Sequence, residues 1–421
     1  MEKNKLVQYD LDIYSETLSN GLRVNIIPKN NVNNIYVTLS TNYGSIHDEF
    51  IPINSLEYYK VPMGVAHFLE HKVFEQEDGI DPFNKFSING ADCNANTSNY
   101  KTTYLFSGPT NIKENIELLL DFVQSPYFTD ENVEKEKGII EQELKMLNDR
   151  PYWKIYESVL SNSFINHPIK YPVGGTVETI KKITKEDLYT CYNTFYHPSN
   201  MFITISGNVD PNEVLNVIKN NQNNKSFDKF KDIVLKKYEE DDKVYKEYEE
   251  ISFDVSLPKI SYAYKINKKD YDINRLKVYL GIYFSVLTDT TSLLDEKLRN
   301  ENIISSGLSF EMVNTDKHVL CIISFETNNY DYVIGELNNI IGKIRISEKD
   351  LERKKKSLKS SFIYRSDNIY SINSKIDSDI IKYNKVIYND FEYIDSLNIV
   401  EMNNILDNIS FDNKCTVILK K

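Results

Sequence analysis

An internal repeat is the feature that most constrains how this chain can fold. Residues 111–137 read as an amphipathic helix followed by a highly charged helix, which Thr129-Asp130-Glu131 opens with N-cap chemistry. Residues 329–355 repeat this pattern, with Ser347-Glu348-Lys349 at the start of the charged helix, so the offset is 347 − 129 = 218 residues. Since a repeat of this kind marks a recurring structural unit, the chain is predicted to contain two similar units of roughly 200 residues.

Strand patterns accompany the helices in both units. Residues 16–24 place an Asn-Gly pair between apolar residues, which is the usual signal of a two-residue β-hairpin. Residues 201–206 form a strand pattern after a predicted helix, and residues 416–419 do the same near the end of the chain. We therefore predict an α+β fold of two homologous units, each with an antiparallel-rich sheet and helices packed on one face.

The segment between the two units has a different composition. Residues 218–250 are polar and charged and contain few periodically spaced apolar residues, which is typical of a linker. We expect a first unit at residues 1–217, a linker region at residues 218–250 and a homologous second unit at residues 251–421. A chain of 421 residues, of which 41% are hydrophobic, is long enough to bury two cores.

The overall composition argues against several classes of protein. The net charge is −12 and the basic residues are interleaved with acidic ones, so we expect no nucleic-acid partner. No stretch approaches the roughly 18–20 consecutive apolar residues that span a bilayer, and the polar start lacks a signal-like apolar core. We therefore expect a cytoplasmic protein without a membrane span. The four cysteines lie far apart without a Cys-x-x-Cys pair, which argues against a disulfide framework and against a thiolate metal site.

The string His67-Phe68-Leu69-Glu70-His71 carries the clearest chemical signal. Residues 65–74 have helical apolar spacing, and on a helix His67 and His71 share a face and can direct two imidazoles to one point. Neutral imidazole nitrogens suit zinc, and Glu70 beside them can reach a metal-bound water without being a ligand. This order is the inverzincin pattern. Taken alone, the string also fits a surface helix with two histidines.

A catalytic zinc usually has three protein ligands, so a third must come from another segment. The predicted helix at residues 133–147 offers Glu136 and Glu143, seven residues apart on one face, whereas Glu141 points about 160° away from Glu143. We predict Glu143 as the third ligand and Glu136 as the hydrogen-bond partner that fixes the tautomer of one histidine. The remaining histidines are predicted to be structural or to face solvent: His47, His167, His197 and His318.

Several segments together resemble the insulinase/pitrilysin family of zinc peptidases. Residues 64–71 and 136–143 are similar to its two signatures, and their separation, 143 − 71 = 72, is close to that of the family. Between them, residues 90–97, followed by Thr103-Tyr104, resemble the strand that borders the cleft, where an Asn-Ala pair meets the substrate. This implies substrate contacts for Asn94 and Ala95. The similarity extends through further segments: residues 172–176 and residues 195–201.

The resemblance implies a zinc peptidase with a zinc ion in the chain, a peptide substrate, and two homologous units in a chain of this length. It also implies that such chains work in pairs, which close around a peptide in a chamber. The similarity is greatest to the small bacterial members, in which an active chain pairs with a similar partner.

One feature of the family is missing here. In active single-chain or partner subunits of the family, a unit of the second type carries an Arg and a Tyr, seven residues apart, that help to bind the substrate carbonyl and its developing oxyanion. Arg299 is followed at the corresponding distance by residues 306–310, which contain no Tyr. The second unit also lacks a His-x-x-Glu-His string, and the position matching Glu143, 143 + 218 = 361, is Ser361. We therefore expect zinc in the first unit only, and a homologous partner chain that supplies the Arg/Tyr pair in a heterodimer, with a homodimer as the alternative.

The predicted function is hydrolysis of peptide bonds in short or unstructured peptides. Zinc is expected to lower the pKa of a water, and Glu70 to accept its proton during attack and to pass it to the leaving amine. An extended peptide is expected to pair with the backbone of residues 94–97. Two alternatives are a non-catalytic scaffold or binding subunit, which retention of the expected chemical residues disfavours, and a dedicated maturation peptidase for one precursor.

Overall fold

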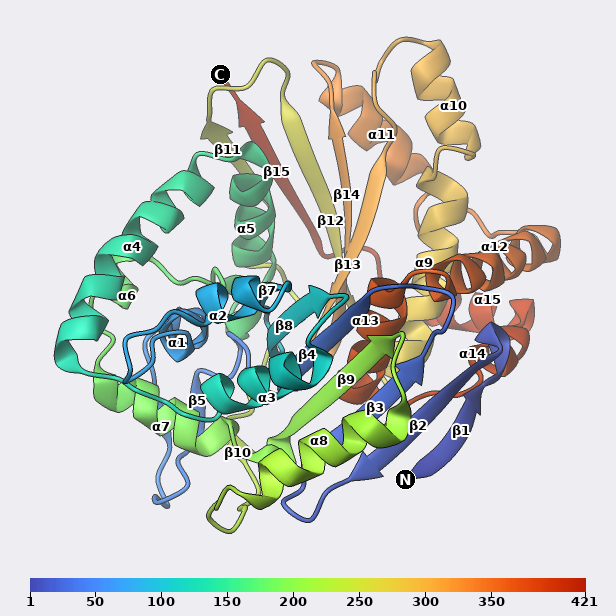
Figure 1. Ribbon diagram of the computed structural model, residues 1–421. Helices are drawn as coiled ribbons and strands as arrows, with labels where there is room; N and C mark the ends of the chain where they lie inside the picture. Colours follow the sequence, from blue (N-terminus) through green and yellow to red (C-terminus); the bar gives the residue numbers. More distant parts are fainter. The chain divides into compact units, whose positions relative to one another are not determined.

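The computed structural model describes residues 1–421, and the chain divides into two compact units (Figure 1). Each unit is assembled from three segments. The first contains Met1–Leu144, Pro172–Lys237 and Ser360–Phe391, and the second contains Lys145–Tyr171, Tyr238–Lys359 and Glu392–Lys421. The division into a first unit at residues 1–217, a linker at residues 218–250 and a second unit at residues 251–421 stays a prediction. None of the helices combines the length and the apolar character that crossing a bilayer requires.

The first unit is built on a seven-stranded sheet with the order β1-β2-β3-β9-β4-β8-β7. All neighbouring strands are antiparallel except β3 and β9. The strands are β1 (Glu2–Leu6), β2 (Leu11–Thr17), β3 (Arg23–Pro28), β4 (Ile35–Thr41), β7 (Asp92–Thr97), β8 (Thr102–Gly108) and β9 (Met201–Gly207). The predicted hairpin forms between β2 and β3, but its connection spans residues 18–22 rather than two residues, with Gly21 at a φ of 92°.

Side chains alternate across this sheet because successive strand residues point to opposite faces. Val37, Leu39, Ile203 and Ile205 lie in the apolar core. The helices of this unit outside its C-terminal segment are α1 (Val65–Val73), α2 (Pro82–Ile88), α3 (Ile112–Val123), α4 (Asp130–Asn148), α6 (Val177–Ile180), α7 (Lys185–Phe195) and α8 (Pro211–Asn223). All seven contribute residues to that core, as the prediction of helices on one face requires.

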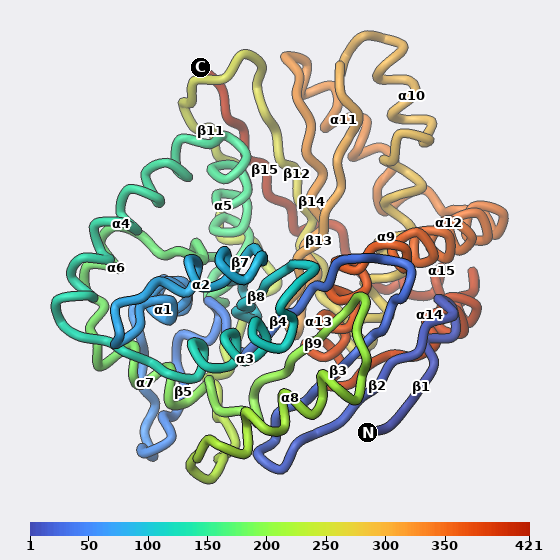
Figure 2. Tube along the Cα trace, in the orientation of Figure 1, coloured from blue at the N-terminus to red at the C-terminus, as the bar shows by residue number.

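The opposite face of the sheet carries polar side chains beside a smaller apolar cluster that includes Phe202, and it is covered by α13 (Ile369–Tyr383), which lies beside β9 and β4 (Figure 2). Asp377 of α13 is 1% exposed and accepts hydrogen bonds from the hydroxyls of Thr38, Ser40 and Thr204. Because buried polar groups are costly unless paired, these hydroxyls on the sheet require a partner such as Asp377. The sequence prediction of helices on one face was therefore incomplete.

The second unit contains a five-stranded sheet with the order β11-β15-β12-β14-β13, antiparallel except between β11 and β15. The strands are β11 (Tyr248–Ser252), β12 (Lys259–Asn267), β13 (Ser309–Asn314), β14 (His318–Glu326) and β15 (Lys414–Lys420). One face shares a core with α9 (Ile273–Thr288), α11 (Tyr330–Ile340) and α15 (Ile399–Asn408). A further helix, α5 (Pro151–Ser163), packs on β15 and β12. The remaining helices are α10 (Leu293–Asn300), α12 (Glu348–Ser366) and α14 (Asp390–Asp395).

The repeat recognised in the sequence recurs in the helices at the same offset. The starts of α3 and α11 differ by 330 − 112 = 218, those of α4 and α12 by 348 − 130 = 218, and those of α5 and α13 by 369 − 151 = 218. The α+β class with two similar halves is thereby confirmed. The helices α5 and α13 occupy equivalent positions in the two halves of the sequence. Each packs on the sheet whose strands come mainly from the other half of the chain, so the two halves exchange these helices.

The segment expected to be a linker contains ordered elements. α8 continues to Asn223, and β10 (Val234–Leu235) pairs with β5 (Glu49–Ile51), which in turn pairs with β6 (Tyr59–Lys60) in a small three-stranded sheet. β11 already begins at Tyr248. Short strands thus occupy part of a segment whose composition is polar.

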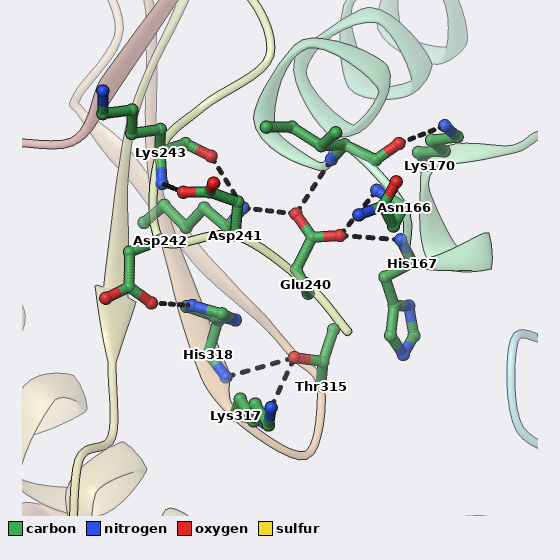
Figure 3. Close-up of polar contacts among 12 residues, drawn as sticks. Asn166, His167, Lys170, Glu240, Asp241, Asp242, Lys243, Thr315, Lys317 and His318 are labelled. Carbon is green, nitrogen blue, oxygen red and sulfur yellow. Dashed lines mark hydrogen bonds and ion pairs between the residues drawn. The ribbon is translucent and has the colours of Figure 1, made fainter. Parts of the chain in front are cut away.

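Glu240 anchors this segment inside the second unit. Its side chain is 2% exposed, and its carboxylate accepts hydrogen bonds from Nζ of Lys265 at 2.5 Å and from the backbone N–H groups of residues 165–167 at 2.7–2.8 Å (Figure 3). The Lys265 side chain is fully buried. This segment, whose charged composition is typical of a solvated linker, therefore takes part in a buried ion pair.

Candidate metal centre

The start of α1 is set by two closely packed backbone segments. Gly64 precedes the helix at a φ of 90°, and a Cβ atom there would lie 2.4 Å from the carbonyl oxygen of Gly174. Gly175 has a φ of 74°, and its Cβ would lie 2.5 Å from the carbonyl oxygen of Met63. Because only glycine accommodates both the left-handed conformation and this close approach, these glycines determine where α1 begins.

The two histidines of α1 and a glutamate of α4 converge on one point. Nε2 of His67 lies 3.7 Å from Oε1 of Glu143, and Nε2 of His71 lies 3.5 Å from Oε2 of the same residue. One ligand atom from each of the three residues falls within 4.8 Å of the others. A tetrahedral zinc site with bonds of about 2.1 Å has ligand atoms about 3.4 Å apart. This donor set and its spacing fit zinc, and no second group of three such ligands occurs in the chain.

Helix α4 delivers the carboxylates because its apolar residues fix its rotation. Val133, Ile140 and Leu144 are buried in the core of the first unit. Glu136 lies on the side of α4 that meets α1, and its Oε1 is 3.1 Å from Nδ1 of His71. Glu141 points away and pairs with Lys181 at 3.2 Å.

Lys72 fastens α1 to α4. Its side chain is fully buried, and its Nζ donates a hydrogen bond to the backbone carbonyl of Asn132 at 3.2 Å, with Glu136 3.9 Å away. The Lys72 ammonium also forms an ion pair with Glu75. This lysine holds the two helices that carry the histidines and the carboxylates in one relative position.

Burial and neighbouring charges shift the pKa values of the two histidines in opposite directions. Burial, together with the neighbouring His71, lowers the pKa of His67 to about 3. Burial acts in the same direction on His71, but the bond and charge of Glu136 outweigh it and raise the pKa of His71. When the Nδ1–H of His71 donates to Glu136, the lone pair of this imidazole lies on Nε2, toward Glu143. Metal ligation requires this neutral form.

Glu70 lies next to the three converging residues without joining them. It is 8% exposed, and its Oε2 accepts a hydrogen bond from the hydroxyl of Thr97 at 2.6 Å. Burial raises the pKa of Glu70, against the opposing effect of the Thr97 bond. A carboxylate with a raised pKa beside a candidate metal site is suited to proton transfer.

The strand that carries the Asn-Ala pair is at the open edge of the sheet. β7 pairs only with β8, and it contacts α1. Asn94 is exposed and Ala95 is half-buried, and Oδ1 of Asn94 accepts a hydrogen bond from the N–H of Ala95 at 2.8 Å. A peptide that pairs with the N–H of Ala95 has to displace this local bond.

Sequence reasoning did not assign Thr97 or Lys72. Thr97 lies in the segment that resembles the family's cleft strand. Strand alternation places Thr97 on the same face as Ala95, and this alternation is the sequence signal that could have identified it. For Lys72, the sequence gives only its position next to His71. The four other histidines take structural contacts, as predicted: His47 stacks on Tyr43 and Phe195, His318 bonds Asp242, and Nδ1 of His167 and of His197 accepts a nearby backbone N–H.

Comparison with known proteins places these features in a family. Residues 50–177 match the family model described as Insulinase (Peptidase family M16), and residues 182–358 match the one described as Peptidase M16 inactive domain. The uncharacterized zinc protease YmfH of Bacillus subtilis is 38% identical over 351 residues, which cover 82% of each chain.

Solved structures agree with these matches. An M16-like peptidase from Alicyclobacillus acidocaldarius superimposes with a TM-score of 0.90 at 29% identity, over 97% of this chain and 98% of that chain. The periplasmic protease PqqL of Escherichia coli has the same fold at 18% identity, with a TM-score of 0.74, and the match covers all of this chain but 48% of PqqL. The chain therefore belongs to the insulinase family of peptidases, family M16.

Proposed function

We propose that this chain is a zinc metallopeptidase that hydrolyses short or unstructured peptides. The observation that carries the proposal is the convergence of His67, His71 and Glu143 at distances close to those of a tetrahedral zinc site, with Glu70 beside them. The Bacillus subtilis relative YmfH is named as a zinc protease, which supports the same assignment.

Each residue has a distinct part in the proposed reaction. His67, His71 and Glu143 would hold zinc, and Glu136 would fix the tautomer of His71. When bound, zinc acts as a Lewis acid that polarises the peptide carbonyl and lowers the pKa of water. Glu70 accepts the proton of the attacking water and passes it to the leaving amine.

The peptide is proposed to bind as an added strand at the edge of the sheet. β7 is an edge strand with no neighbouring strand along its outer side, and Asn94 and Ala95 lie at its centre. Backbone pairing of this kind gives affinity with little sequence preference. Such backbone pairing suits a general peptidase. A dedicated maturation enzyme would differ from a general one in its contacts with the substrate's side chains.

Metal analysis of the purified protein tests the site. Wild-type protein is expected to contain about one zinc ion per chain, and Glu143→Gln is expected to lose most of it because a ligand is removed. Glu141→Gln is the matched control on the same helix, since Glu141 points away toward Lys181. A chelator should abolish peptide hydrolysis and added zinc should restore it. Wild-type protein that neither binds zinc nor cleaves peptides would instead support a non-catalytic scaffold.

We also propose that the active form pairs this chain with a homologous partner that supplies the missing Arg/Tyr pair. The length of PqqL supports this, because one PqqL chain is long enough for two copies of this chain. The purified chain alone is expected to cleave a peptide mixture slowly, and addition of the homologous partner should raise kcat. Full activity of a monomer would contradict pairing, and full activity of a dimer of this chain alone would favour a homodimer.

A further inference from the structure

The two oxygens of the Glu70 carboxylate have different surroundings. Oε2 accepts the hydroxyl proton of Thr97 at 2.6 Å, a distance typical of a charge-assisted O–H···O bond. The hydrogen bond from Thr97 goes to Oε2 and leaves Oε1 outside it. One oxygen is therefore held and the other is available for proton transfer.

The hydroxyl of Thr97 is committed to this bond by its neighbours. Thr97 pairs with Thr102 across β7 and β8, and their hydroxyl oxygens are 3.2 Å apart. Thr102 is fully buried, and its hydroxyl donates to the backbone carbonyl of Tyr43 at 3.0 Å. Each hydroxyl has a single proton to donate. With Thr102 directed to Tyr43, the proton of Thr97 is directed to the nearer acceptor, Glu70.

The end of β7 that carries Thr97 is fixed on two sides. On one side, the carbonyls of Ser98 and Asn99 accept hydrogen bonds from the N–H groups of Ser45 and Ile46, both at 3.1 Å. On the other side, Nζ of Lys101 binds Oδ2 of the buried Asp377 on α13 at 3.0 Å. The turn between β7 and β8 is therefore anchored both to the loop after β4 and to α13.

We propose that Thr97 is a positioning residue, which fixes Oε2 of Glu70 and thereby presents Oε1 to the attacking water. This inference rests on the proposed role of Glu70 as general base. Thr97 does not contact the converging ligands through any hydrogen bond, so its contribution passes through Glu70. A free glutamate side chain samples several rotamers. Because the anchored turn holds Thr97 in place, the hydrogen bond from Thr97 restricts Glu70 to the rotamer that faces the ligands.

Two substitutions at this position separate the hydroxyl from the shape of the side chain. Thr97→Val keeps the shape and removes the donor, and it is expected to lower kcat about 10- to 100-fold with little change in KM and unchanged zinc content. Thr97→Ser keeps the donor and is expected to recover most of kcat. Thr17→Val, at an exposed position of β2, is the matched control and should behave as wild type.

The possible outcomes are distinguishable. A wild-type kcat for Thr97→Val, an equal loss in the Val and Ser variants, or a loss confined to KM would each overturn the positioning role while the zinc peptidase remained active. Failure of the proposed function would appear differently, as a wild-type protein that neither binds zinc nor cleaves peptides.

A double-mutant cycle measures the contact independently of turnover. Urea unfolding of Thr97→Val, Glu70→Ala and the combined variant is expected to give a coupling of about tenfold in the unfolding equilibrium constant. Additive effects would show that the two side chains do not interact, and would overturn the proposal.

Discussion

Glu70→Gln is expected to lower kcat for peptide hydrolysis by about 10²- to 10⁴-fold while the protein keeps its zinc. The amide of glutamine has almost the same shape as the carboxylate, and its carbonyl can still accept the hydroxyl proton of Thr97. It cannot act as a base at neutral pH, so the proton of the attacking water has no acceptor. Steady-state kinetics with a fluorogenic peptide, together with zinc analysis of the same sample, measures both properties.

The control for this variant is Glu77→Gln, an exposed position just after α1. It should leave kcat, KM and zinc content unchanged. If Glu70→Gln turned peptide over at the wild-type rate, another residue would have to be the general base. If it lost zinc as well as activity, Glu70 would contribute to metal binding and not to proton transfer alone.

Glu240→Gln is expected to destabilise the protein by about 3–5 kcal/mol, because it leaves the buried ammonium of Lys265 without its counter-charge. Equilibrium urea unfolding measures the change in the free energy of unfolding. Glu239→Gln is the matched control in the same segment, since Glu239 is exposed and its pairing with Lys317 lies at the surface. It should change the urea midpoint little.

A second substitution tests whether the effect comes from the unpaired charge. Adding Lys265→Met to Glu240→Gln removes the buried ammonium, so the double variant should be more stable than Glu240→Gln alone. A double variant no more stable than the single one would mean that the loss comes from the bonds to residues 165–167 instead.

The contribution of Glu240 also sets a direction for the dependence of stability on pH. Burial opposes its ionisation, but Lys265 and the three backbone N–H groups outweigh burial and lower its pKa. A carboxyl group whose pKa is lowered by folding stabilises the protein above its unfolded pKa, about 4.3, and this stabilisation is lost as the pH falls through the folded pKa. The difference in stability between wild type and Glu240→Gln should therefore narrow below about pH 4. An unchanged difference there would contradict the charged state of Glu240.

Local patterns in the sequence predicted the parts of the candidate site that lie on single helices. The spacing of His67 and His71, and of Glu136 and Glu143, places each pair on one face of a helix whatever surrounds it. The offset of 218 residues likewise anticipated the matching starts of α4 and α12, because helix starts depend on local capping residues. These features follow from short-range geometry, which the order of residues contains directly.

Contacts between distant segments decided the rest. The apolar pattern of α13 predicts a buried face but not that it packs on the sheet formed mainly by the other half of the chain. The composition of residues 218–250 is that of a solvated linker, and only the arrangement of Lys265 and residues 165–167 makes Glu240 a buried anchor.

The sequence by itself therefore predicted the side chains of the candidate site and determined which helix faces present them. The tertiary structure decided that His67, His71 and Glu143 meet, and that Thr97 reaches Glu70. The physical reason is that a helical or strand period fixes directions within an element, whereas distances between elements depend on the packing of the whole core.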